Sequence, residues 1–388
     1  MGIKSEARLS DFEAISMIVG NSIGTGIVAV PYLARKNSML DVIWICAVAY
    51  IVNVILHLII AELSYNNGGQ QLVKSFEGEF FQGHPKAKKI FSWIMFAVYG
   101  LGIMVGVAGN INGGARVFVD SFGVSMKAGQ IIYYLIAGFV VFLGMKAVGI
   151  AQKYSVIALF GIVVAMSIGT FIGLPANGFG RAPFHWNNLL ALYSMIIFAT
   201  SANQAVIQVV KGVNGDVPRI RRIIFTGFGI SVGFVLLVTA TVLYGTQGAP
   251  DKELAYLVLG GQIGRWAYVL AGLFTLFALM TTFWTHTLSL RDVVHEQLDL
   301  DNRICWAIAT IPCILFSLFG EDSFILLTRL MGGVVVFVGI LLVFAYGKSR
   351  RRHNNESPIC GKAGSIPFQI IMIVSTILSA AGAVIKIS

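Results

Sequence analysis

Eleven apolar segments, each long enough to cross a lipid bilayer, limit this chain to very few folds. A helix rises 1.5 Å per residue, so roughly 20 apolar residues span about 30 Å of hydrocarbon. The segments cover residues 13–35, 39–63, 90–119, 128–146, 152–174, 187–210, 220–246, 265–290, 303–319, 322–345 and 365–386. The sequence therefore predicts an all-α polytopic membrane protein with eleven transmembrane helices in the lipid bilayer.

Composition and motifs exclude several classes of protein. Hydrophobic residues make up 56% of the chain and charged residues only 12%, whereas soluble domains carry about 25% charged residues. The net charge of +10 comes from basic residues scattered among short loops, which suits membrane topology better than nucleic acid. The four cysteines lack metal or disulfide spacing, and catalytic motifs are absent from the sequence. We therefore expect no enzyme activity, no cofactor and no nucleic-acid partner.

The first segment contains a run of helix-weakening residues at its middle, from Val19 to Gly26. Three glycines and three short polar side chains disfavour continuous helix here. Broken backbone at membrane depth is tolerated where it is buried in protein or lines a cavity, and broken helices mark the midplane sites of secondary transporters. The alternative is a helix-packing face, because Gly20 and Gly24 have the GxxxG spacing.

A second polar cluster, from Phe198 to Gln204, interrupts the sixth segment. The two interrupted segments therefore open two halves of nearly equal length. Because each half holds five crossings, the second must enter the membrane from the opposite side, as in a 5+5 inverted-repeat transporter with broken helices 1 and 6. The expected parts are an N-terminal tail, two repeats, a basic loop and one extra C-terminal helix, at residues 1–12, 13–174, 187–345, 346–364 and 365–388.

Lysine and arginine predict the orientation of the chain. With the N-terminus inside, 19 of the 28 basic residues fall on the cytoplasmic side and eight on the other. This positive-inside bias predicts a cytoplasmic N-terminus and an external C-terminus. The run Arg350 to Arg352 either anchors this topology or binds anionic lipid.

Helix dipoles indicate what the two breaks would bind. Backbone amides at residues 24–26 carry partial positive charge and suit a carboxylate, while carbonyls near 19–21 and 198–200 suit an ammonium group. Both together fit an α-amino acid. The side chains of Phe198, Asn203 and Trp284 are expected to select among substrates. The expected substrate-binding residues are Asn21, Ser22, Gly24, Thr25, Gly26, Phe198, Thr200, Ser201, Asn203 and Trp284.

Three stretches resemble a known transporter group. Residues 23–31 are similar to the opening helix of the amino acid/polyamine/organocation superfamily. Residues 212–224, and 277–283 with 288–292, resemble the hydroxy and aromatic amino acid permeases. That family is bacterial, has eleven crossings and imports tryptophan, tyrosine, serine or threonine, generally with protons. The resemblance implies a permease of the bacterial inner membrane. Residues 200–204 differ from the aromatic-rich pattern of members with aromatic substrates, which leaves the substrate open.

Four residues are candidates for ion coupling, namely Lys153, Thr281, Thr282 and Glu62. The two threonines could offer hard oxygen ligands to sodium, as similar folds do, or bond back to their own helix. Lys153 resembles the lysine that replaces the ion in sodium-independent members of the superfamily, or it reaches interfacial water. Glu62 either titrates or pairs with a basic residue. His57 either relays protons or is packed and hydrogen-bonded.

The sequence therefore predicts a secondary active transporter that imports an amino acid by alternating access, with an aromatic substrate and proton coupling favoured. The alternatives are a sodium-coupled symporter of small neutral amino acids and a non-transporting membrane receptor on the same scaffold. A channel would be expected to show rings of charge or repeated carbonyl filters, and the sequence has neither.

Overall fold

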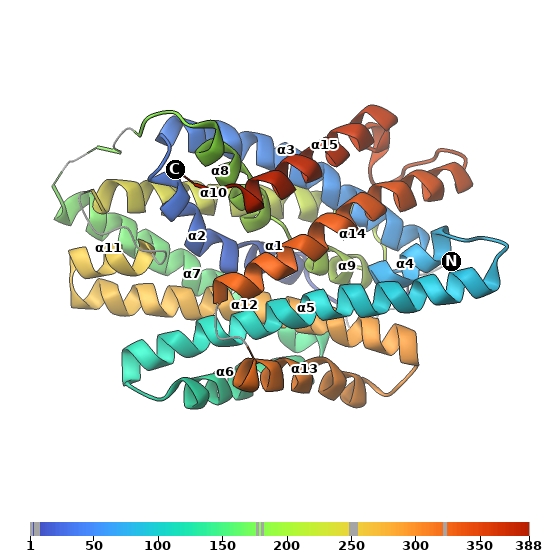
Figure 1. Cartoon of the computed structure of the whole chain (residues 1–388), viewed down its shortest axis with the longest axis horizontal. Helices are drawn as coiled ribbons and strands as arrows, with labels where there is room; N and C mark the ends of the chain where they lie inside the picture. Colours follow the sequence, from blue (N-terminus) through green and yellow to red (C-terminus); the bar gives the residue numbers. More distant parts are fainter. Residues whose placement is uncertain are drawn as a thin grey trace.

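The computed structural model describes residues 3, 8–175, 178–179, 182–247, 255–320 and 324–387, without the side chains of residues 25, 28 and 324–336. Within these ranges the chain forms helices and no strands. Most helices run along the long axis of the molecule, and the two chain ends lie at opposite ends of that axis (Figure 1). The all-α prediction is confirmed.

Helices occupy all eleven segments predicted to cross the membrane. They are α1 and α2 (Asp11–Ser22, Thr25–Ala34), α3 (Met39–Asn66), α5 (Pro85–Phe122), α6 (Met126–Phe142), α7 (Met145–Gly173), α8 and α9 (Trp186–Ala199, Asn203–Gly212), α10 (Val217–Gly245), α12 (Arg265–Leu298), α13 (Asn302–Phe319), α14 (Phe324–Arg352) and α15 (Ile366–Val384). Eight spans in the described chain, with α8 and α9 counted as one, are long and apolar enough to cross a membrane. The two breaks fall where the sequence places them.

Shorter helices lie in the connections. They are α4 (Leu72–Glu79), α11 (Ala255–Ile263) and a 3₁₀ helix (Gly361–Gly364). One expected boundary differs, because α14 continues to Arg352 and the predicted loop at 346–364 therefore begins as helix. Charged residues extend this helix into the interface, since nothing in Lys348 to Arg352 breaks it.

The start of α1 follows from its sequence. Ser10 accepts a hydrogen bond from the amide of Glu13, and the Glu13 carboxylate accepts one from the amide of Ser10 at 2.8 Å. This is the predicted capping box, which satisfies two free amides at the helix start. Ser38 and Asp41 form a second one at the start of α3.

The buried apolar side chains form two clusters that meet at the two breaks. Ile18 of α1 belongs to one cluster and Ile23 to the other. In the same way, Ala199 at the end of α8 and Ala202 before α9 belong to different clusters. Each broken helix therefore joins two separately packed parts of the bundle. Helix α15 packs on α8 and α14, at the edge of the bundle.

The orientation of the bundle can be tested with reporter fusions. A reporter that is active only in the cytoplasm, fused after Arg352, should be active, because the basic residues gather at that end. The same reporter fused after Ser388 should be inactive, and an externally active reporter should show the reverse pattern. Two fusions that report the same side would contradict the eleven-crossing topology.

Candidate functional site

The first break separates α1 from α2 by two residues. The hydroxyl of Ser22 donates to the carbonyl of Ile18 at 2.9 Å, and the amide of Ile23 donates to Val19 at 2.8 Å. Helix α2 then starts after Gly24, which has no side chain to cap the first amides. Its amino end is therefore a place where backbone donors are available to an anion.

The second break separates α8 from α9. The amide of Thr200 donates to Ile196 at 3.0 Å and that of Ser201 donates to Phe198 at 3.1 Å, which closes the end of α8. Helix α9 starts after Ala202, whose side chain cannot cap it. Ser201 and Asn203 remain partly accessible, and the hydroxyl of Ser201 donates to the Asn203 amide oxygen at 3.2 Å.

Two side chains of α3 hold both sides of the second break. The Asn53 amide donates to Thr200 Oγ1 at 2.7 Å and to the carbonyl of Ile197 at 3.1 Å. The amide of Ala202 donates to Nε2 of His57 at 2.9 Å, while Nδ1 lies 2.6 Å from the carbonyl of Asn53. Because Nε2 accepts, the ring proton is on Nδ1 and His57 is neutral. This geometry favours the packed, hydrogen-bonded interpretation of His57.

Asn21 connects the two breaks directly. Its amide nitrogen donates to the carbonyl of Ser201 at 3.3 Å, and its amide oxygen accepts from the hydroxyl of Thr285 in α12. The structure therefore brings Asn21, Ser201 and Asn203 together through these contacts. Thr285 joins them without having been predicted, although it lies four residues after Thr281 on the same helical face.

The glycines at the first break are packed against protein. A β-carbon added at Gly24 would lie 2.8 Å from Thr282 Cβ, and one added at Gly26 would lie 2.6 Å from Ala199 Cβ. The space that a β-carbon would take at these glycines is thus filled by Thr282 and Ala199. Close helix packing therefore also requires glycine at these positions, which agrees with the packing alternative. Binding through the backbone amides stays a prediction.

The other expected substrate residues divide between the site and its surroundings. Phe198 is half-buried at the end of α8, while Ser22 is turned back to its own helix. The indole of Trp284 donates to the carbonyl of Ala137 in α6 at 3.0 Å, so the structure turns this side chain away from the breaks. The side chain of Thr25 lies outside the described part of the chain.

Lys153 does not lie between α1 and α12. Its ammonium group lies 5.8 Å from the ring centre of Phe12 and 5.4 Å from that of Tyr154. Residue 153 is one position past the buried face of α7, so its side chain turns to the outside of the bundle. This corrects the position that the coupling hypothesis requires of Lys153.

Gln152 occupies the place expected for Lys153. This fully buried side chain donates to the carbonyl of Thr281 at 2.6 Å, and its Cδ would lie 3.0 Å from a β-carbon at Gly20. The hydroxyls of Thr281 and Thr282 donate to the carbonyl of Ala278 in their own helix, at 2.9 and 3.3 Å. The helical period of α7 places the side chain of residue 152 on the buried face of the helix. The positive charge of the next residue, Lys153, is the more conspicuous sequence feature, although it lies off that face.

Glu62 lies away from the breaks. Its carboxylate accepts from the amides of Ile359 and Cys360 at 3.0 and 2.7 Å, and from the hydroxyl of Tyr346 at 3.2 Å. In the described part of the chain, no basic residue lies within ion-pair distance of this carboxylate. Glu62 instead holds the connection between α14 and α15 against α3, because a buried carboxylate needs hydrogen-bond donors.

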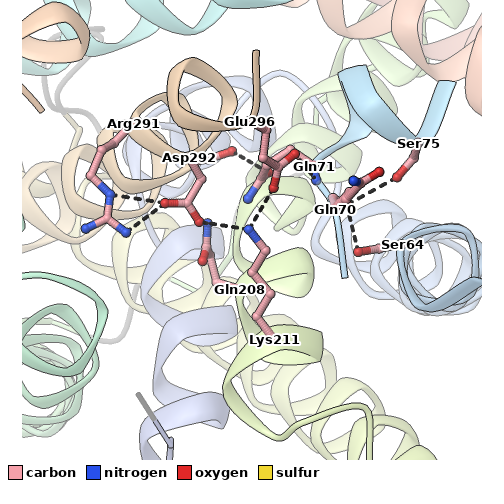
Figure 2. A network of polar contacts seen from close by, with 10 residues as sticks. Ser64, Gln70, Gln71, Ser75, Gln208, Lys211, Arg291, Asp292 and Glu296 are labelled. Atoms are coloured by element: carbon pink, nitrogen blue, oxygen red, sulfur yellow. Dashed lines mark hydrogen bonds and ion pairs between the residues drawn. The ribbon is translucent and has the colours of Figure 1, made fainter. Parts of the chain in front are cut away.

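A charged network of buried and partly buried side chains joins α9 to α12 at the end of the bundle that holds the N-terminus (Figure 2). Lys211 lies 3.1 Å from the carboxylate of Asp292 and 2.8 Å from that of Glu296. Arg291 also pairs with Asp292 at 2.7 Å, and the amide of Gln71 donates to Glu296 at 2.8 Å. Two cations and two carboxylates balance, which allows the group to be buried.

The segment before α1 covers the same end. The amide of Leu9 donates to the carbonyl of Gly212 at 2.8 Å, and its side chain is buried. Asp11 pairs with Arg219 at 2.6 Å, and this hydrogen bond holds the pKa of Asp11 below its ordinary value. Together with the charged network, these contacts hold the segment before α1, the end of α9 and α12 together on the predicted cytoplasmic side of the breaks.

Comparisons with known proteins give a structural result only. No protein-family model matches the sequence, and a search of curated proteins gives no significant match. The solved structure of MhsT in complex with L-phenylalanine is similar, with a TM-score of 0.73 and 13% identity over 97% of this chain and 99% of MhsT. The chain has the LeuT fold of membrane transporters.

A second solved structure agrees. Mhp1, a nucleobase-cation-symport-1 family transporter in a closed conformation with bromovinylhydantoin bound, matches with a TM-score of 0.67 and 13% identity, over 98% of this chain and 93% of Mhp1. At this identity the likeness shows the fold alone. Among the described residues of this LeuT-fold chain, no group of three or more His, Cys, Asp or Glu could hold a metal ion.

Packing at the first break can be tested with alanine substitutions. Gly26→Ala should destabilise the protein by about 1–3 kcal/mol, because a methyl group must displace Ala199. Gly161→Ala in α7 is the matched control, since nothing lies within 4 Å of a β-carbon there. Thermal unfolding in detergent measures both. Equal stability of the two variants would refute the packing role.

The role of His57 can be tested by hydrogen exchange. His57→Ala leaves the amide of Ala202 without its acceptor, so exchange around residues 201–204 should accelerate by about tenfold. His57→Gln restores an acceptor and should show a smaller effect. The exposed His185→Ala is the control. Unchanged exchange in His57→Ala would show that this contact does not hold the break.

Proposed function

We propose that the chain is a secondary transporter that moves an amino acid by alternating access, with the substrate bound between the two helix breaks. The observation that carries this proposal is the contact of Asn21 with the carbonyl of Ser201. It brings four helix ends together at the middle of a transporter fold. Backbone groups at such ends have unsatisfied donors and acceptors, which a zwitterion can use.

The polarity of the helix ends supports an α-amino acid. The amino ends of α2 and α9, at Thr25 and Asn203, present amides that suit the carboxylate. The carboxyl ends of α1 and α8 present carbonyls that suit the ammonium group. Partly accessible Ser201, Asn203 and Phe198 would then contact the substrate side chain.

An aromatic substrate remains our preferred assignment. Phe198 beside the second break offers a ring for stacking, and the sequence resemblance to aromatic amino acid permeases points the same way. MhsT, whose structure is similar to that of this chain, has been solved in complex with L-phenylalanine. The bacterial inner membrane, with the N-terminus in the cytoplasm, is the proposed location.

Alternating access requires the closed end to open. The path from the breaks to the predicted cytoplasm is blocked by Leu9 and by the pairing of Lys211 with Asp292 and Glu296. We propose that the pairs of Lys211 with Asp292 and Glu296 separate when α1 and α9 move together away from α12. Such ion pairs can form and separate during a cycle at a small cost in free energy. When they separate, hydration of the charges offsets much of the lost electrostatic attraction.

Coupling is proposed to be independent of sodium. The resemblance to proton-coupled permeases favours this, and the fully buried side chain of Gln152 fills the space beside the two threonines, where it donates to the carbonyl of Thr281. The threonine hydroxyls are directed to their own helix. Gln152 is neutral and does not titrate, so a proton must use another group. The buried carboxylates of Asp292 and Glu296 are candidates, because they lie in the contact that opens.

Uptake into proteoliposomes tests the function and the coupling together. Radiolabelled aromatic amino acids should accumulate in sodium-free buffer when the outside is more acidic. Gln152→Ala should reduce uptake by about tenfold, because Thr281 loses its donor. Lys153→Gln, one residue away on the exposed side, is the control and should keep wild-type uptake.

Three results would contradict these proposals. Strict sodium dependence that is lost in Thr282→Ala would establish the sodium-coupled alternative. Uptake of small neutral amino acids alone would reject the aromatic substrate. Specific binding without any uptake would support the non-transporting receptor.

A further inference from the structure

A basic cavity lies where α14 leaves the bundle, beside the loop that follows α4. Its volume is about 410 Å³. Charged and aromatic side chains line it together. Helix α4 lies at the end of the bundle that holds the N-terminus (Figure 1). The lining residues are Glu79, Phe81, Gln82, Lys348, Arg351 and Arg352.

The cavity carries an excess of positive charge. Glu79 is its one carboxylate, and it pairs with Arg352 at 3.2 Å. Arg352 also donates to the carbonyl of Gly78 at 2.9 Å. In the described part of the chain, Lys348 and Arg351 have no carboxylate within ion-pair distance. Two positive charges therefore remain for an anion.

Apolar surface borders this charge. Phe344 is 56% exposed and lies one helical turn before Lys348, so the two share a face of α14. Arg351 continues that face after one more turn. On the other side of the cavity Phe81 is 45% exposed and packs on Phe91 of α5. A phospholipid has a charged headgroup at the membrane surface and apolar chains deeper in the bilayer. The charged side chains near the end of α14 and the exposed ring further along the helix have the same order.

Lys348 is held in place by an aromatic ring. Its ammonium group lies 4.6 Å from the centre of the Phe80 ring. A cation held over a ring keeps its charge and remains able to donate hydrogen bonds. The cavity is therefore built by α4, its following loop and α14 together, and does not depend on one basic run alone.

We propose that this cavity binds the phosphate headgroup of an anionic phospholipid, with Lys348 and Arg351 contacting the phosphate. The acyl chains lie along Phe344 on the outer surface of α14. This site is separate from the helix breaks, and it holds whether or not the chain transports an amino acid.

Native mass spectrometry tests the site. The full-length protein is titrated in neutral detergent with phosphatidylglycerol, and separately with phosphatidylcholine of the same chain length. Phosphatidylglycerol should bind more tightly to the wild type. The double variant Lys348→Gln with Arg351→Gln should lose about 25-fold in affinity, or about fivefold for each charge.

Matched variants separate this site from general surface charge. Arg303→Gln removes another basic residue that lies over an aromatic ring, Phe142, at a different place. It should change the affinity by less than about twofold. Lys348→Arg keeps the charge and should keep the binding. Thermal unfolding in neutral detergent should be the same for all variants, which shows that they are folded.

Competition with inorganic phosphate decides the source of the anion. If millimolar phosphate displaces phosphatidylglycerol completely, the ligand is a free anion and the lipid proposal is overturned. Equal binding of the two lipids to the wild type overturns it too. Equal loss of binding in Arg303→Gln would show unspecific charge attraction and would also overturn it.

Discussion

Backbone groups at a broken helix inside a membrane must find partners within the protein, and the centre of this structure depends on that constraint. Helix α3 meets it at the second break, where Asn53 donates to the end of α8 and His57 accepts from the start of α9. Asn21 then joins this break to the first one through Ser201. Polar side chains on neighbouring helices thus replace the hydrogen bonds that an unbroken helix would make.

The same breaks also separate the two apolar clusters of the molecule. Each broken helix passes from one apolar cluster to the other, so its two halves are packed against different surroundings. Movement at a break therefore need not disturb either cluster. At the predicted cytoplasmic end, Leu9 and the Lys211 network join helices whose inner halves adjoin the breaks. In the proposed transport cycle, the pairs of Lys211 are the contacts at which α9 separates from α12.

Close packing at the breaks has a chemical consequence for coupling. Gly20 and Gly24 let α1 approach α12, and Gln152 fills the remaining space with a neutral amide. This amide donates a hydrogen bond to the carbonyl of Thr281 in α12. Lys153 faces outward, because adjacent residues of a helix point about 100° apart. The rotation of α7 about its axis thus places the neutral amide of Gln152, and not the ammonium group of Lys153, against α12.

The sequence by itself determined the helices and their breaks. Apolar length sets the number of spans, and the glycine and polar clusters near Gly24 and Ser201 place the breaks within a few residues. These features are local, so they can be read without knowing what packs where. Tertiary structure alone decided the partners. Asn53 with Thr200, Gln152 with Thr281 and Trp284 with α6 are contacts between distant segments. They depend on how each helix is rotated about its axis, and hydropathy averaged around a buried helix carries little of that information.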